Sequence, residues 1–188
     1  MKKRIAIFAS GSGTNAEEIL KKFHHHPAIE VVVLLSNNPS AFALKRAEKF
    51  EVETSVFDKQ TFKNTDQIVS LLQDKKVDLL VLAGFMWLIP KNLVNAFPNK
   101  IINIHPALLP KYGGKGMYGM HVHNAIKENK ETETGITIHY VNEHYDEGQI
   151  IFQAKCNLSP SDAPEDIANK VHQLEHAHYP EIIEGLFL

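Results

Sequence analysis

The sequence predicts an α/β protein with a mostly parallel, open β-sheet flanked by helices and an antiparallel addition in the C-terminal half. Through the first half, short apolar runs alternate with helical patterns, which is typical of right-handed βαβ crossovers. Near the C-terminus, two strand-like runs are separated only by a short turn, which favours antiparallel pairing. No internal repeat, low-complexity segment or linker divides the chain, so we expect a single domain over residues 1–188.

Each expected element has its own local signal. The expected strands of the first half are short apolar or β-branched runs, at residues 4–9, 31–35, 53–56, 77–83 and 101–104. The expected helices carry apolar residues at helical spacing, and they cover 15–23, 41–50, 64–75 and 90–97. The second half predicts a glycine-rich loop, a helix end, two strands and a final helix, at 111–120, 125–129, 137–141, 149–158 and 161–178.

Composition excludes several classes of protein. The chain has 20 Lys and Arg against 22 Asp and Glu, a net charge of −2, which argues against a dedicated nucleic-acid binder. No apolar run reaches the ~20 residues of a membrane-spanning helix, and the N-terminal apolar run is too short for a signal peptide. The single cysteine, Cys156, excludes an intramolecular disulfide. We expect a cytoplasmic protein with no membrane or nucleic-acid partner.

A glycine loop follows the first expected strand and opens the first expected helix. Its sequence, Gly11-Ser12-Gly13-Thr14-Asn15-Ala16, matches the G-x-G-x-x-A form of the dinucleotide fingerprint. That interpretation also needs a carboxylate at the end of the second strand, where this chain has Leu35-Ser36-Asn37-Asn38. The loop therefore predicts a site for one phosphate rather than for NAD, the alternative being a tight turn without a ligand.

A second group of residues carries candidate chemistry. Asn103 and His105 stand two apart at the carboxyl end of an expected strand, so they point to the same side. An amide and a protonated imidazole are two donors suited to a developing oxyanion. Asp146, in a turn with Gly148, would raise the pKa of His105 if the two were close. The alternatives are an Asn–His pair that ties down the turn before Pro106, and an aspartate that serves only its own turn.

These motifs occur together and in order along nearly the whole chain. With them stand three further runs, Leu82-Ala83-Gly84-Phe85-Met86, Pro106-Ala107-Leu108-Leu109-Pro110 and Gln173-Leu174-Glu175-His176. The chain thereby resembles the phosphoribosylglycinamide formyltransferases, the folate-dependent GAR transformylases of purine synthesis. The Asn-x-His-Pro and Asp set is shared with the wider group of formyl-folate transferases and hydrolases. The phosphate loop and the Glu175 segment resemble the glycinamide ribonucleotide enzymes specifically.

The resemblance implies formyl transfer from 10-formyltetrahydrofolate, as co-substrate, to the amine of glycinamide ribonucleotide (GAR), without a metal. It implies Asn103, His105 and Asp146 as the catalytic residues. The implied GAR-binding residues are Gly11, Ser12, Gly13, Thr14, Asn15 and Glu175. The implied folate-binding residues are Lys59, Met86, Trp87, Leu88, Ile89, Asn103, Asn142, Glu143, His144, Tyr145 and Asp146. Lys59 stands where bacterial relatives have an arginine, and the loop at 111–120 is longer than relatives commonly have.

Other functions share part of this pattern. The same three catalytic residues serve hydrolysis of 10-formyltetrahydrofolate, although relatives with that activity carry an additional N-terminal domain. Formylation of initiator tRNA requires a basic C-terminal domain, and a non-catalytic nucleotide-binding module would need only the phosphate loop. The chain is expected to be a monomer or a homodimer.

Several histidines need no metal to explain them. We interpret His24 to His26 as a solvated helix end, and we interpret His121 and His123 as residues that precede a helix without a third ligand. His139 is either a polar core residue or a support for the catalytic trio. Of the apolar residues 85–87, Trp87 is expected to be partly exposed as a wall for a flat ring.

Overall fold

A seven-stranded sheet forms the centre of the computed structural model, which describes residues 1–187. The strand order is β3-β2-β1-β4-β5-β6-β7, and the strands are β1 (Lys3–Phe8), β2 (Ile29–Ser36), β3 (Thr54–Val56), β4 (Leu79–Leu82), β5 (Ile101–His105), β6 (Glu133–Tyr140) and β7 (Ile150–Asn157). Strands β1 to β5 pair in parallel, whereas β6 and β7 are antiparallel. The predicted fold class, including its antiparallel addition, is confirmed.

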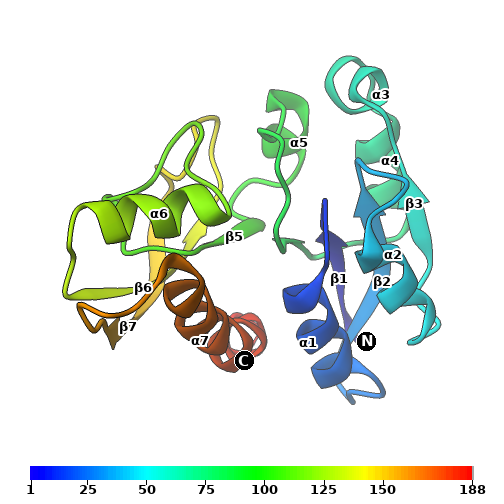
Figure 1. The fold of residues 1–188 in the computed structure, drawn as a ribbon. Coiled ribbons are helices and arrows are strands. Elements are labelled where there is room, and N and C mark those ends of the chain that lie inside the picture. Colours follow the sequence, from blue (N-terminus) through cyan, green and yellow to red (C-terminus); the bar gives the residue numbers. More distant parts are fainter. Residues whose placement is uncertain (188) are drawn as a thin grey trace.

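Helices cover both faces of the sheet (Figure 1). One face carries α1 (Thr14–Phe23), α2 (Phe42–Glu48) and α7 (Pro164–Gly185), with α6 (Met120–Glu128) packed on α7; the other carries α3 (Lys59–Asn64), α4 (Gln67–Asp74) and α5 (Lys91–Ala96). Strand β1 serves both layers, because Ile5 and Ile7 point into one apolar cluster while Ala6 and Phe8 point into the other. Alternation along a strand produces this division.

Three elements differ from the predictions. Helix α3 was not expected, and it begins after Asp58, whose side chain caps the helix by accepting from the Thr61 backbone N–H. Helix α6 begins at Met120, so His121 and His123 lie in its first turn rather than before it. Helix α7 runs past His178 to Gly185 with Pro180 inside it.

The packing of α7 explains why a proline does not end it. Tyr179 and Ile183 are fully buried on either side of Pro180, so apolar burial outweighs the lost backbone hydrogen bond. The Tyr179 hydroxyl donates to the backbone oxygen of Leu82, at 2.9 Å, at the end of β4. The C-terminal helix is thus anchored to the middle of the sheet.

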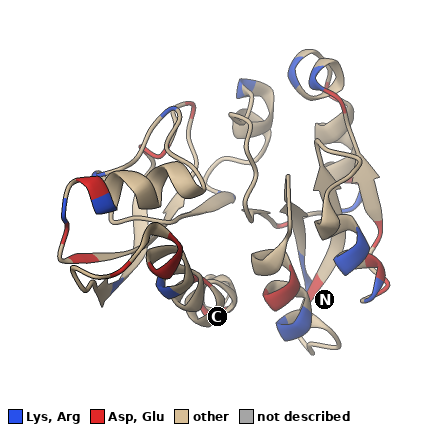
Figure 2. Cartoon of the chain, viewed as in Figure 1, with Lys and Arg blue, Asp and Glu red and all other residues tan. Residues whose placement is uncertain are grey.

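Charged residues are interspersed over the outer helices and loops, and neither sign forms a continuous face in this view (Figure 2). Within residues 1–187, no helix is long and apolar enough to cross a membrane. Leu188, the last residue of the predicted domain, lies outside the described residues.

The strand order changes direction between β1 and β4, and this arrangement creates the space for a ligand. In open α/β sheets, the loops that leave two such strands diverge and form a crevice at their carboxyl ends. Ser10 joins the loops around this crevice. Its hydroxyl donates to Asn37 Oδ1 at 2.6 Å, and it accepts from the backbone N–H of Met86 at 2.9 Å.

Candidate active site

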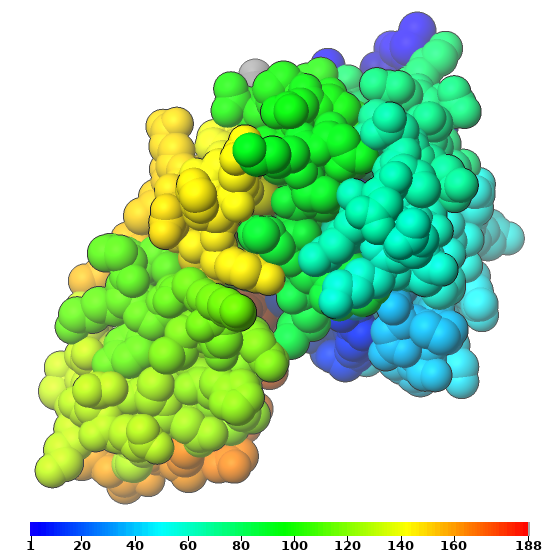
Figure 3. Space-filling view, turned by 90° about the horizontal axis from the view of Figure 1, so that it is seen from above, coloured from blue at the N-terminus to red at the C-terminus, as the bar shows by residue number. Residues whose placement is uncertain are grey.

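A cavity of about 600 Å³ occupies the crevice at the carboxyl ends of β1, β4 and β5. Viewed from above, the surface is hollowed where the yellow segment around residue 145, the green loop and the blue N-terminal segment converge (Figure 3). The cavity brings together most of the predicted site residues: Gly11, Ser12, Gly13, Thr14, Asn15, Met86, Trp87, Leu88, Ile89, Asn103, His105, His144, Tyr145, Asp146 and Glu175.

The phosphate loop is held from behind by α2. Gly13 has a left-handed backbone with φ +72°, and a Cβ at this position would lie 2.5 Å from Ala43 Cβ, so only glycine fits. Arg46 of α2 donates from Nε to the Ser12 backbone oxygen at 2.8 Å. Gly13 is also the N-cap of α1 and provides no side-chain cap, which leaves the first N–H groups of this helix for an anion.

Asn15 and Glu175 join the two ends of the chain at the floor of the cavity. Asn15 Nδ2 donates to Glu175 Oε2 at 2.9 Å, although the residues are 160 positions apart. Burial raises the pKa of the Glu175 carboxyl, while the Asn15 hydrogen bond acts against this rise. Asn15 Oδ1 is buried without a hydrogen-bond partner among residues 1–187. A polar ligand with hydroxyl groups would satisfy both side chains.

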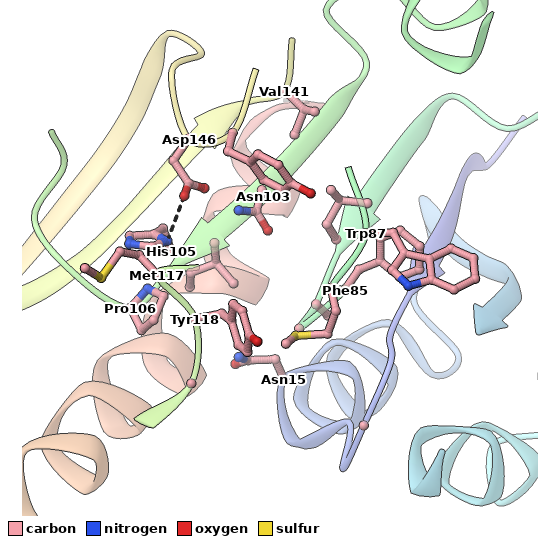
Figure 4. A pocket seen from close by; sticks show the side chains of 18 of the residues that line it. Asn15, Phe85, Trp87, Asn103, His105, Pro106, Met117, Tyr118, Val141 and Asp146 are labelled. Carbon is pink, nitrogen blue, oxygen red and sulfur yellow. Dashed lines mark ion pairs between the residues drawn. The ribbon is translucent and has the colours of Figure 1, made fainter. Parts of the chain in front are cut away.

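His105 lies beside Asp146, across the pocket from Trp87 (Figure 4). Both of its ring nitrogens face acceptors. Nε2 donates to the backbone oxygen of Tyr112 at 2.7 Å. Nδ1 is 3.5 Å from Asp146 Oδ2, which is longer than a direct charge-assisted hydrogen bond. A protonated His105 is therefore firmly held through Nε2, while its Nδ1 proton remains available to a bound oxygen.

Burial sets the pKa of His105 against the influence of its neighbours. The distant Asp146 does lie beside His105, as proposed from the sequence, and its charge acts to raise the imidazole pKa. Burial is the larger influence and acts in the opposite direction, so the pKa of free His105 is lowered below its ordinary value. The predicted effect of Asp146 is therefore present, but burial of the ring outweighs it.

His139 supports the trio from β6. Its Nδ1 lies 2.8 Å from the Tyr140 backbone oxygen, which can only accept, so Nδ1 carries a proton. Nε2 lies 3.2 Å from Asn103 Nδ2 and 3.6 Å from Asp146 Oδ1. His139 thus contacts both Asn103 and Asp146, as expected of a support for the trio, and it is also a buried residue of the core.

Asp146 adopts a left-handed backbone with φ +57° in the turn before β7. Burial raises the pKa of its carboxyl, but His139, His105 and the Gly114 N–H, which donates to Oδ2 at 3.0 Å, outweigh burial and lower it. Asp146 is therefore ionised at neutral pH. Because Gly114 and Tyr112 belong to the same glycine-rich loop, this loop contacts both titratable members of the trio.

An apolar wall follows β4 on the opposite side of the cavity. Phe85 and Trp87 pack edge to face, with ring centroids 6.4 Å apart, and both contact the buried ring of Phe62. Trp87 is half-buried, as predicted, but Met86 is more exposed at 44%. With Val141 and Tyr145 across the cavity, these side chains form a slot suited to a flat ring.

Three of the predicted folate-binding residues do not line the cavity. Lys59 is exposed at the start of α3, Asn142 accepts the His144 backbone N–H at 2.9 Å, and Glu143 forms an ion pair with Lys91 at 3.1 Å. Conversely, the cavity is also lined by residues outside the predicted site set, namely His123, the loop residues from 114 to 119, and His172, for which the sequence left a solvated and a substrate-facing role open. Two signals in the sequence could have found these histidines. His123 belongs to a helix, and His172 stands three residues before Glu175 on another helix, so the two side chains share a face. Within residues 1–187, no group of three His, Cys, Asp or Glu side chains is arranged to hold a metal ion.

The fold and the site define an α/β group-transfer enzyme, with a glycine loop at a helix N-terminus and an amide–imidazole–carboxylate group in one cavity. The family model described as formyl transferase matches residues 3–183. The chain therefore belongs to the formyl transferase family.

Curated relatives carry a common name. The chain is 38% identical to a phosphoribosylglycinamide formyltransferase of Haemophilus influenzae, over 97% of this chain and 86% of that protein. It is also 38% identical to the chloroplastic phosphoribosylglycinamide formyltransferase of Arabidopsis thaliana, over 98% of this chain and 65% of that protein, so it spans just under two thirds of the plant enzyme.

Solved structures agree with these relatives. The chain resembles the crystal structure of glycinamide ribonucleotide transformylase 1 from Geobacillus kaustophilus, with a TM-score of 0.90 and 34% identity over 99% of both chains. It also resembles the phosphoribosylglycinamide formyltransferase of Streptococcus pneumoniae, with a TM-score of 0.87 and 31% identity over the full length of both.

Proposed function

We propose that the protein transfers a formyl group from 10-formyltetrahydrofolate to the amine of N1-(5-phospho-D-ribosyl)glycinamide in purine biosynthesis. The products are formyl-GAR and tetrahydrofolate, and the reaction needs no metal. One observation carries this proposal: the phosphate loop and the Asn103–His105–Asp146 centre open into the same cavity, facing an apolar slot. A phosphorylated acceptor and a flat-ringed donor can therefore meet at the catalytic trio. The names of the relatives support the same reaction.

The two substrates enter from different sides of the cavity. The GAR phosphate binds the N–H groups at Gly11–Asn15, and the ribose hydroxyls bind Glu175. The pterin ring of the donor occupies the slot formed by residues 86–89 and 144–146. Lys59, Asn142 and Glu143 are not part of this proposal, because they do not line the cavity.

The chemistry is one addition and one elimination at the formyl carbon. The substrate amine attacks this carbon, and its oxygen becomes an oxyanion stabilised by Asn103 Nδ2 and by Nδ1 of protonated His105. The attacking amine loses a proton, N10 of the folate gains one, and the bond between the formyl carbon and N10 breaks. Asp146 stabilises the charged imidazole and orders the water that carries the proton.

Burial makes Asp146 necessary in this mechanism. Because the protein environment lowers the pKa of His105, the imidazolium needs the ionised Asp146 carboxylate at 3.5 Å to be populated. A developing oxyanion adds a second negative charge beside the ring. Both charges favour the imidazolium at the moment when the donor is needed.

A single assay tests the proposed function against its alternatives. Consumption of 10-formyltetrahydrofolate is followed with and without GAR. We expect consumption that requires GAR and yields formyl-GAR. Consumption independent of GAR would indicate a hydrolase with the same site, and no consumption in either case would indicate a non-catalytic binding module. We further propose that residues 1–188 act as one domain, as a cytoplasmic monomer or homodimer with small-molecule partners only.

A further inference from the structure

His123 is a buried polar residue that the proposed mechanism does not use. It lies in the first turn of α6, is only 2% exposed, and borders the cavity. Its Nδ1 is enclosed without a hydrogen-bond partner among the residues that the structure describes. The other ring nitrogen, Nε2, also has no hydrogen-bond partner among the described residues but is not enclosed, so it is the nitrogen that a ligand in the cavity can reach.

The protonation of His123 follows from its surroundings. Burial, followed by the nearby His172 and His105, lowers the pKa of His123 to about 4, so the ring is neutral at pH 7. A neutral imidazole carries one proton. A proton on Nδ1 would bury a donor without an acceptor, whereas a proton on Nε2 leaves Nδ1 as a bare lone pair. The proton therefore lies on Nε2, on the side of the ring away from the enclosed nitrogen.

The position of His123 identifies the part of the substrate that it meets. His123 lines the same cavity as His105, His172 and Glu175, and its helix α6 packs on α7, which carries His172 and Glu175. His123 thus borders the cavity that joins Glu175 to the proposed catalytic His105. A GAR molecule that extends from Glu175 to His105 places its glycyl amide between its ribose and its amine.

We propose that His123 is a recognition residue for the acceptor substrate, whose Nε2–H donates a hydrogen bond to the glycyl amide oxygen. The inference rests on the proposed function and deepens it. A neutral donor suits a neutral carbonyl, and the hydrogen bond fixes the segment that carries the attacking amine. His123 thereby selects an acceptor in which an amide stands between a phosphoribosyl group and a primary amine.

The test compares GAR binding in wild type, His123→Phe, His123→Gln and the matched control His121→Phe, which changes an exposed histidine on the same helix. We expect His123→Phe to raise the Kd of GAR about tenfold, as for the loss of one hydrogen bond, and to leave the Kd of the folate donor unchanged. His123→Gln, which supplies an amide N–H, recovers part of the loss. The control binds GAR as wild type does.

A substrate pair isolates the amide contact. GAR is compared with its glycyl thioamide analogue, in which sulfur, a weaker hydrogen-bond acceptor, replaces the carbonyl oxygen and the amide nitrogen stays uncharged. Wild type should bind the thioamide more weakly than GAR, whereas His123→Phe should bind the two with similar affinity. The proposal would be overturned if folded His123→Phe bound GAR with unchanged affinity. It would also be overturned if the loss of affinity caused by the variant and the loss caused by the substrate change simply multiplied.

One measurement needs no variant. In ¹⁵N-labelled wild type, we expect the His123 spectrum to show the Nε2–H form and its proton to move downfield when GAR binds; an Nδ1–H form would contradict the assignment. These outcomes are separate from the proposed function, which fails only if wild type does not transfer formyl groups to GAR.

Discussion

Replacement of His123 by phenylalanine should make the protein more resistant to acid. The pKa of this imidazole is lowered from 6.5 to about 4 in the folded chain, chiefly by burial. In the unfolded chain the ring is solvated and takes up its proton near 6.5. Folding therefore excludes a proton that the unfolded chain binds, so the free energy of unfolding falls as the pH drops from about 6.5 to about 4.

The lowered pKa sets the size of this effect. Each pKa unit corresponds to about 1.4 kcal/mol, so His123 alone costs wild type about 3 kcal/mol across that pH range. At a rough 2–4 °C per kcal/mol for a chain of this size, the melting temperature falls by about 6–12 °C from this residue. His123→Phe removes the cost. At pH 7.5 the variant should be at least as stable as wild type, because an apolar ring replaces the unpaired Nδ1.

Urea unfolding at intervals between pH 7.5 and 4 measures the difference between the two proteins. We expect the variant's advantage to grow by about 3 kcal/mol toward pH 4. His121→Phe should show no such growth, because that side chain is exposed in the folded as well as the unfolded chain. A difference between wild type and His123→Phe that stays constant with pH would refute the reasoning, since it would mean that His123 titrates alike in both states.

Three further predictions test the trio and the phosphate loop, two by substitution and one by ligand binding. Asn103→Ala should lower turnover by ~100- to 1000-fold with little change in the Kd of GAR, and near-normal turnover would remove Asn103 from the oxyanion site. Asp146→Asn should lower the pKa of His105 further, because the carboxylate acts to raise it, and the pH optimum of the residual activity should move down. The double variant Asp146→Asn, His105→Ala should turn over little more slowly than the slower single variant. If the two losses in turnover multiply and the pH optimum does not move, His105 and Asp146 are not coupled. GAR, bound at Gly13, should raise the melting temperature whereas NAD should not, and equal stabilisation by NAD would favour a dinucleotide site.

Local patterns were sufficient to predict most of the fold. The strands and most helices follow from short-range periodicity and turn residues, and Asn103 and His105 were paired correctly because the side-chain period of a strand is two. Helix α3 was missed because only the Asp58 cap and one buried aromatic, Phe62, mark it.

The candidate site was less predictable, because its properties arise from distant segments. The sequence separation of His105 and Asp146 says nothing about their distance, and a family resemblance supplied this pairing. The pKa of His105 depends on how deeply the ring is buried, which no local pattern predicts. Lys59 was carried over by its position in the chain, but the orientation of α3 leaves it exposed and away from the cavity.

The hydrogen bond between Asn15 and Glu175 joins a segment that the ribosome makes early to a segment that it makes late. The phosphate loop is among the first segments to leave the ribosome, yet its partner arrives 160 residues later on α7. The same helix buries Tyr179 against the sheet, where its hydroxyl donates to the Leu82 backbone oxygen. A nascent chain that lacks α7 therefore lacks Tyr179 in its core and Glu175 in the proposed acceptor site. We expect the chain to bind the proposed acceptor only once α7 has docked on the sheet.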